Sequence, residues 1–148
     1  MEPKSLEINL PTLMELGPII EAEIHKDVSS FLHSKNFKES EQIRGIRMLI
    51  DTGSNISGLD RKIIDQLELS KYEGLEAVHG VGGAYNLKRY NCILYLPIFE
   101  KKALPLDVLE GDYSEAPFDG VLGRDVLQYC RFTYDGWNNT YVLSAINI

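Results

Sequence analysis

The sequence predicts a mainly β domain, and three observations support this prediction. Short apolar segments recur along the chain, and in several of them apolar and polar residues alternate as in half-buried strands. The 12 glycines and 6 prolines are spread between these segments, which is typical of turns joining strands. A chain of 148 residues with 44% hydrophobic and 25% charged residues has the size and composition of one globular domain, so we expect a single domain over residues 1–148.

The N-terminal part contains one clear strand pattern. Residues 1–16 show little periodicity and include two prolines, so we expect an irregular arm or an interface strand there. From Ile20 to His25 apolar and polar side chains alternate, which predicts a half-buried strand with His25 on its solvent-exposed face. Residues 27–42 are mostly polar, and we expect a long loop, either irregular or holding a short helix.

The central predicted strand is the apolar segment Ile43–Ile50, whose alternate residues share one face. It leads directly into the tetrapeptide Asp51-Thr52-Gly53-Ser54. Shortly afterwards, Asp60 has the position of an N-cap for a short helix that ends at Leu67.

The second half of the chain predicts more strands and a glycine-rich hairpin. The segment Val78–Gly83 precedes an extended run and has the composition of a hairpin tip. Phe118–Asp125 is expected to join a strand to a short helix, with Asp125 suited to capping that helix. Further strands are expected at Tyr85–Leu96, Ile93–Phe99, Leu104–Leu109, Phe132–Tyr134 and Thr140–Ile146.

Asp51 is the strongest candidate for chemistry in this chain. It is a carboxylate on a glycine turn reached from a buried strand, and burial makes a carboxylate costly to ionise unless the group is paired or used. A reaction that needs one carboxyl group as base and another as acid requires two of them, but the chain contains no second Asp-Thr-Gly or Asp-Ser-Gly. A two-fold axis beside the Asp51 turn would supply the second carboxylate from another copy, so we expect a homodimer.

The glycine-rich tip, Gly80-Val81-Gly82-Gly83, has three interpretations. A phosphate-binding loop is disfavoured, because no helix and no Lys-Ser or Lys-Thr pair follows the glycines. A flexible turn without a role remains an alternative, since glycine turns are common in β proteins. We favour a mobile hairpin that closes over a cleft.

Composition argues against several other functions. The formal charge of -7, the pI near 4.9 and the scattered basic residues disfavour a nucleic-acid partner. No segment has the length of a membrane span and no signal-peptide core follows Met1, so we expect no membrane association and a cytoplasmic location. The histidines and cysteines lack metal-ligand spacing, so we expect no metal or cofactor, and Cys92 and Cys130 are expected to be reduced core thiols.

Three segments, in the order Leu49–Ser54, His79–Gly83 and Val121–Asp125, resemble the retropepsins. These are the single-domain, homodimeric aspartic peptidases of retroviruses and their cellular and microbial relatives. The resemblance runs from about Ile43 to Ile146. It implies a closed, orthogonal acid-protease barrel with one short helix after the corner Gly123-Arg124-Asp125.

The resemblance also implies roles for individual residues. Asp51 would be the catalytic residue, with two copies activating a water molecule across the dimer axis. Thr52, Gly53 and Ser54 would support the catalytic loop, with the Thr52 hydroxyl bonding the partner's turn. The tip Gly80-Val81-Gly82-Gly83 would be a substrate-binding flap.

The corner residues Gly123, Arg124 and Asp125 look structural by the same resemblance. In viral members the arginine pairs with an acidic residue four positions beyond the catalytic aspartate, where this chain has Asn55. Arg124 therefore needs another acceptor or a weaker bond from Asn55. Viral relatives also interleave terminal strands across the dimer, which Tyr141–Ile148 would do here.

Two functions from different classes remain in competition. One is an aspartic endopeptidase that hydrolyses extended peptide or protein segments between the flap and an Asp51 dyad. The other is a non-catalytic dimeric module that binds a peptide or partner in the same cleft. The intact Asp51-Thr52-Gly53 and the glycine tip favour the enzyme, because binding alone needs no acid dyad.

Overall fold

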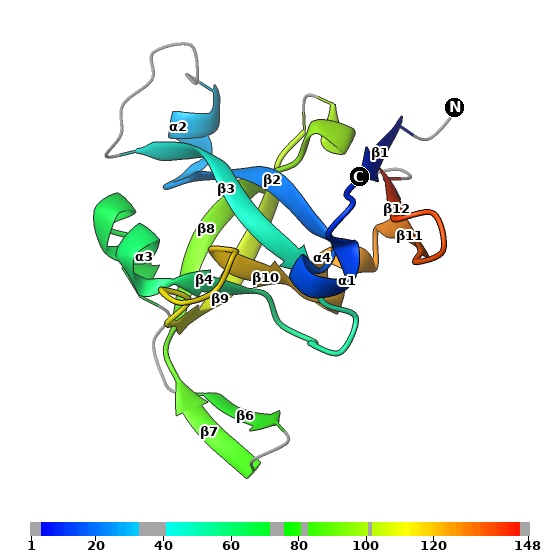
Figure 1. The fold of residues 1–148 in the computed structure, drawn as a ribbon. Helices are drawn as coiled ribbons and strands as arrows, with labels where there is room; N and C mark the ends of the chain where they lie inside the picture. Colours follow the sequence, from blue (N-terminus) through cyan, green and yellow to red (C-terminus); the bar gives the residue numbers. More distant parts are fainter. Residues whose placement is uncertain (1–3, 33–40, 72–75, 81–82, 101, 146–148) are drawn as a thin grey trace.

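The computed structural model describes residues 4–32, 41–71, 76–80, 83–100 and 102–145, and it is mainly β (Figure 1). The elements follow in the order β1 (Lys4–Asn9), α1 (Leu13–Leu16), β2 (Ile19–His25), α2 (Val28–Leu32), β3 (Gln42–Ile50), β4 (Gly58–Asp60), α3 (Arg61–Leu67), β5 (Ser70–Lys71), β6 (Glu76–Gly80), β7 (Gly83–Leu87), β8 (Arg89–Tyr95), the 3-10 helix η1 (Pro97–Phe99), β9 (Leu104–Gly111), β10 (Gly120–Leu122), α4 (Arg124–Leu127), β11 (Cys130–Asp135) and β12 (Thr140–Ala145).

Six strands form a closed barrel in the order β2-β3-β10-β4-β9-β8, which closes because β8 also pairs with β2. The barrel is mixed, since β10 runs parallel to β3 and β4 runs parallel to β9, while the other neighbours are antiparallel. The predicted mainly β fold with a closed barrel is confirmed. The short helix expected at the corner is α4, which begins at Arg124.

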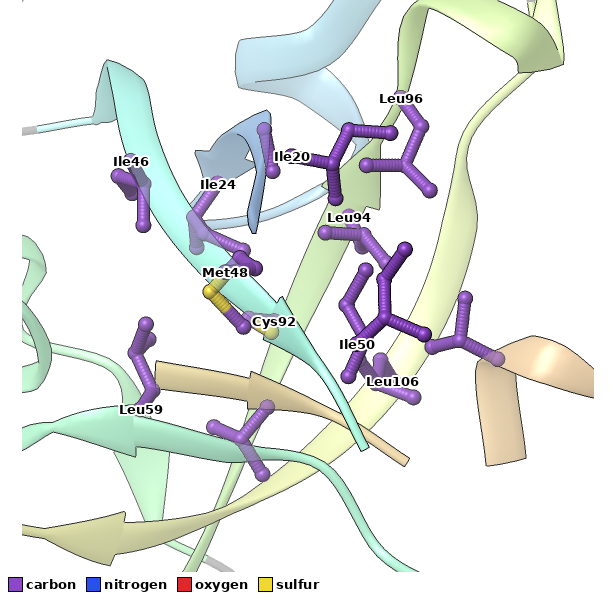
Figure 2. Packing of buried hydrophobic residues seen from close by; sticks show 14 of the residues in the cluster. Ile20, Ile24, Ile46, Met48, Ile50, Leu59, Cys92, Leu94, Leu96 and Leu106 are labelled. Carbon is purple, nitrogen blue, oxygen red and sulfur yellow. The ribbon is translucent and has the colours of Figure 1, made fainter. Parts of the chain in front are cut away.

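The barrel interior is the hydrophobic core. The alternate residues Ile46, Met48 and Ile50 of β3 point inward and are almost fully buried. Figure 2 shows them beside residues of β2 and β8 such as Ile24 and Leu94. The period-2 pattern therefore places one face of β3 in the core. Burial of this face holds β3 in place, and β3 leads directly into Asp51.

A second sheet, in the order β1-β12-β11, packs against the barrel. β12 is its middle strand and pairs with β1 on one side and β11 on the other, all within one chain. Both edges of β12 are therefore occupied within one chain, by β1 and by β11, and this arrangement leaves residues 141–145 no open edge for a partner strand. Residues 146–148 lie outside the described part.

His25 corrects one prediction about β2. It was expected on the exposed face, but its side chain is fully buried and its Nε2 lies 3.1 Å from Oε2 of Glu23. The ring packs edge-on against Phe31, with 5.2 Å between ring centroids. Phe31 belongs to α2, so this helix covers the outward face of β2 at His25.

Several local predictions can be compared with the structure. Asp60 caps α3 by accepting a hydrogen bond from the Lys62 amide at 3.0 Å, as predicted. The expected strand Ile93–Phe99 is wrong at its end, because β8 stops at Tyr95 and Pro97 begins η1. Proline suits the first position of a helical turn and cannot donate to a strand ladder.

The structure describes part of the remaining features that were expected. Within the segment 27–42, α2 is the short helix, and residues 33–40 lie outside the described part. Cys92 is buried and Cys130 half-buried, and both are free thiols. Among the described residues, no helix is long and apolar enough to cross a membrane, and no cluster of three metal-ligating side chains occurs.

Candidate active site around Asp51

Asp51 lies where two parallel strands end side by side. It follows the buried Ile50 of β3, and its backbone amide donates to the carbonyl oxygen of Leu122 at the end of β10, at 2.9 Å. Parallel strands end at the same edge of a sheet, so this contact fixes Asp51 at the rim of the barrel. Its side chain is partly exposed there instead of buried.

The turn after β3 orients the Asp51 carboxylate. Its Oδ1 accepts a hydrogen bond from the Gly53 amide at 2.9 Å, and its carbonyl oxygen accepts one from the Ser54 amide at 3.3 Å. A Cβ atom at Gly53 would lie only 3.2 Å from the same Oδ1. The glycine thus lets the backbone approach the carboxylate closely. The result is a carboxylate held by the backbone and open to solvent.

Ser54 supports the loop and not the carboxylate. Its Oγ donates to the carbonyl oxygen of Ile56 at 2.7 Å, and its own carbonyl oxygen accepts from the Arg124 amide at 2.7 Å. The Thr52 side chain is exposed. Within one chain, the two hydroxyl residues of the tetrapeptide therefore differ in role, since Ser54 closes the loop and Thr52 faces outward.

Gly123 brings the α4 corner directly against this loop. A Cβ atom at this position would lie 2.8 Å from the Ser54 carbonyl oxygen and 2.9 Å from the Ile56 carbonyl carbon. Both are backbone atoms, which cannot move aside as a flexible side chain does. The amide of Gly123 also donates to Oγ of Ser57 at 2.9 Å. Glycine is required here by this close approach.

Asp125 binds the far end of the same loop. Its Oδ1 accepts from Oγ of Ser57 at 2.7 Å, and its Oδ2 accepts from the Ser57 amide at 2.9 Å. The expectation that Asp125 caps the helix is wrong, because the N-cap of α4 is Gly123. The carboxylate instead satisfies the donors of a fully buried serine.

Ser57 is a site residue that the sequence did not indicate. It follows a polar, turn-like segment, so nothing local distinguishes it from an exposed loop serine. Its importance comes from Asp125, which lies 68 positions further along the chain. Only the pairing of β3, β10 and β4 brings the two residues together.

Arg124 finds its acceptor in the Asp51 turn. Its Nη1 donates to the carbonyl oxygen of Thr52 at 2.7 Å, across 72 positions of sequence. The acceptor is thus a backbone carbonyl next to Asp51, so a negative charge at position 55 is not needed for this contact. A charge-assisted hydrogen bond of this kind holds the turn against α4.

The Asp125–Ser57 pair provides a test of the corner. Asp125→Asn replaces a carboxylate oxygen with an amide that donates, and the buried Ser57 then faces a donor where it needs an acceptor. We expect the free energy of unfolding to fall by about 1–3 kcal/mol in urea denaturation.

A matched control exists at Asp112, which accepts from the amide and Oγ of Ser114 at 3.0 and 2.6 Å in an exposed turn. Asp112→Asn should have a much smaller effect, because water replaces the lost acceptor. Equal losses in the two variants would contradict the structural role of the Asp125 contact.

The glycine-rich hairpin forms, but the expected single strand Tyr85–Leu96 is divided at Lys88 into β7, which belongs to the hairpin, and β8, which belongs to the barrel. β6 and β7 pair antiparallel, with Gly80 opposite Gly83. Figure 1 shows this hairpin projecting from the barrel. Val81 and Gly82, which were expected at the tip of a flap, lie outside the described residues.

Comparisons with known proteins find similarity to solved structures and none to family models or curated sequences. No family model matches the sequence, and a search of curated proteins finds no match. Among solved structures, the chain is similar to the solution structure of Simian Foamy Virus (mac) protease, with 12% sequence identity and a TM-score of 0.46. The similarity covers 76% of this chain and 93% of that chain.

Proposed function

We propose that the protein is an aspartic endopeptidase that acts as a homodimer. The observation that carries this proposal is the setting of Asp51. It is a solvent-accessible carboxylate at the rim of a closed barrel, oriented by the Gly53 amide, on a turn that Arg124 holds through the Thr52 carbonyl oxygen. A loop fixed by this many contacts is suited to holding a reacting group in place. The family resemblance of the three motifs supports the same function.

The chemistry requires a second Asp51, because one carboxylate cannot act as acid and base at once. Two close carboxylates share one proton, since both cannot ionise at that distance. The ionised Asp51 takes a proton from water as the water oxygen attacks the scissile carbonyl carbon, and the protonated Asp51 donates to the carbonyl oxygen. The C–N bond then breaks as the Asp51 that took the water proton passes it to the leaving nitrogen, and the other Asp51 takes back a hydroxyl proton as the carbonyl re-forms. No metal enters these steps.

The β6–β7 hairpin is the proposed flap over the substrate. Its closure would exclude bulk water and hold an extended peptide against the dyad. The competing function, a dimeric module that only binds peptides, would use the same cleft without turnover.

Peptide cleavage is the test of this function. Purified protein at high concentration would be incubated with a mixed peptide library between mildly acid and neutral pH, with and without a pepstatin-type inhibitor. We expect cleavage that the inhibitor blocks. Library binding without cleavage by a protein proven to be dimeric would favour the binding module instead.

The proposed dimer contact is the outer edge of β11. This strand has a neighbour on one side only among the described residues, and two large aromatic side chains on it and its turn are exposed, Tyr134 (49%) and Trp137 (94%). β11 follows α4 directly, and α4 holds the Asp51 turn through Arg124. A two-fold axis beside β11 would therefore pass near the Asp51 turn and extend the sheet across both copies.

The variant Tyr134→Ser/Trp137→Ser tests this contact. We expect at least a roughly tenfold weaker dimer by analytical ultracentrifugation, because exposed aromatic residues supply much of the energy of a typical interface. Activity should fall at low protein concentration and recover at high concentration. Leu32→Ser removes an exposed apolar side chain of α2 (70% exposed) and should leave dimerisation unchanged. Equal behaviour of the two variants would exclude β11 as the contact.

A further inference from the structure

Tyr113 lies over the strands next to the Asp51 turn. It belongs to the segment between β9 and β10, and its ring folds back onto two glycines. A Cβ atom at Gly111 would lie 2.7 Å from its Cε2 atom, and a Cβ atom at Gly58 would collide with its hydroxyl oxygen. Gly58 and Gly111 belong to the paired strands β4 and β9. Because both residues are glycines and have no side chain, the Tyr113 ring has room to lie over the two strands.

The surface under this ring is continuous with Asp51. Leu49, Val121 and Gly58 are cross-strand neighbours on β3, β10 and β4, so their positions share one face. The residues that follow them along each strand are buried in the barrel core, which places Leu49 and Val121 on the outward side, where both are partly exposed. Asp51 is two positions beyond Leu49 and thus continues this face to the end of β3.

A second aromatic ring backs Tyr113. Its ring centroid lies 5.9 Å from that of Phe118, with a tilt of 55° between the rings. Such a pair restricts the motion of both rings. The outward face beside Asp51 is therefore bounded by apolar side chains on the strands and by a braced phenol above them.

The Tyr113 hydroxyl is a hydrogen-bond donor available to a ligand. No hydrogen bond links it to another described residue. Burial and then the negative charges of Asp51 and Asp60 raise the pKa of Tyr113 above its usual value. The phenol therefore stays protonated through neutral pH and keeps its hydrogen to donate.

We infer that Tyr113 forms the wall of the substrate site next to Asp51 and limits the size of the substrate side chain beside the cleaved bond. This inference rests on the proposed function. The ring fills the space over Gly58 beside Val121, so a substrate side chain that lies against Val121 has less room there, which favours aliphatic side chains over aromatic ones. The preferred substrates are peptides with Val, Leu or a similar aliphatic residue at that position.

The experiment profiles one peptide library with the wild type, Tyr113→Ala and Tyr113→Phe. Tyr113→Ala removes the wall, and we expect kcat/KM for peptides with Phe or Trp beside the cleaved bond to rise at least about tenfold relative to those with Val or Leu. Tyr113→Phe is the matched control, because it keeps the ring and should retain the wild-type ranking. A folded Tyr113→Ala with an unchanged ranking would overturn the inference.

Two additions keep the result decisive. If Tyr113→Ala does not fold, as judged by circular dichroism, Tyr113→Leu takes its place with the same expected direction. If the wild type cleaves nothing, the proposed function fails, and the same library is selected for binding instead. A broader set of bound side chains for Tyr113→Ala would then still support the wall, whereas an identical set or no binding would reject it.

Discussion

Asp51→Asn is expected to lower kcat/KM for peptide hydrolysis by at least about 10³-fold, because an amide cannot exchange the proton that the reaction needs. The substitution is nearly isosteric, and the Asn oxygen can still accept the hydrogen bond from the Gly53 amide. The fold should therefore survive, with circular dichroism and the free energy of unfolding close to the wild type. Retained hydrolysis would place the chemistry at another residue.

Mixing the two proteins extends this test to the dimer. Each proposed site uses one Asp51 from each copy, so random exchange at equal amounts leaves only about one quarter of the dimers with two aspartates. At equal total protein concentration, the activity of the mixture should fall toward one quarter of the activity of the wild type alone. A fall to only one half, the result of simple dilution, would show that one chain carries a complete site.

Gly123→Ala is expected to give the largest loss of stability, about 2–4 kcal/mol in the free energy of unfolding. The added methyl group would meet the backbone of Ser54 and Ile56 at 2.8–2.9 Å. The corner or the loop after Asp51 must then shift, and the Arg124 contacts to the loop shift with it. We therefore also expect hydrolysis to fall more than the population of folded protein does.

Gly45→Ala is the control for this substitution. Gly45 has a positive φ of 71°, and a Cβ atom added there would have no neighbour within 4 Å, so the only expected cost is backbone strain of about 1 kcal/mol. Urea denaturation of both variants separates steric displacement from a general glycine effect. If Gly123→Ala costs no more than Gly45→Ala, the close approach at the corner is not important for stability.

The features that the sequence predicted correctly are local. Ile43–Ile50 alternates its apolar residues, so burial of one face follows from the two-residue period of a strand. Asp60 precedes a short apolar stripe, so its capping of α3 depends only on residues within one helical turn. Asp51 also stands out locally, because an acidic glycine turn directly follows the buried strand.

The errors and omissions concern contacts between distant segments. His25 fits the alternation of β2, but Phe31 of α2 packs against its ring and the outward face of the strand is buried there. Asp125 has the position of a helix cap, but a buried serine on another segment takes its carboxylate. Each side chain is compatible with several partners, and the segment that comes to lie beside it decides among them.

The sequence by itself determined that this chain is a mainly β protein with a carboxylate turn at the end of its central strand. Only the tertiary structure decided how that turn is held, by Arg124 and Gly123 from the corner after the neighbouring strand β10, and that Tyr113 covers the surface beside it. The physical reason is that periodicity and capping act over a few residues. Hydrogen bonds and close packing instead join whichever segments the closed barrel brings together.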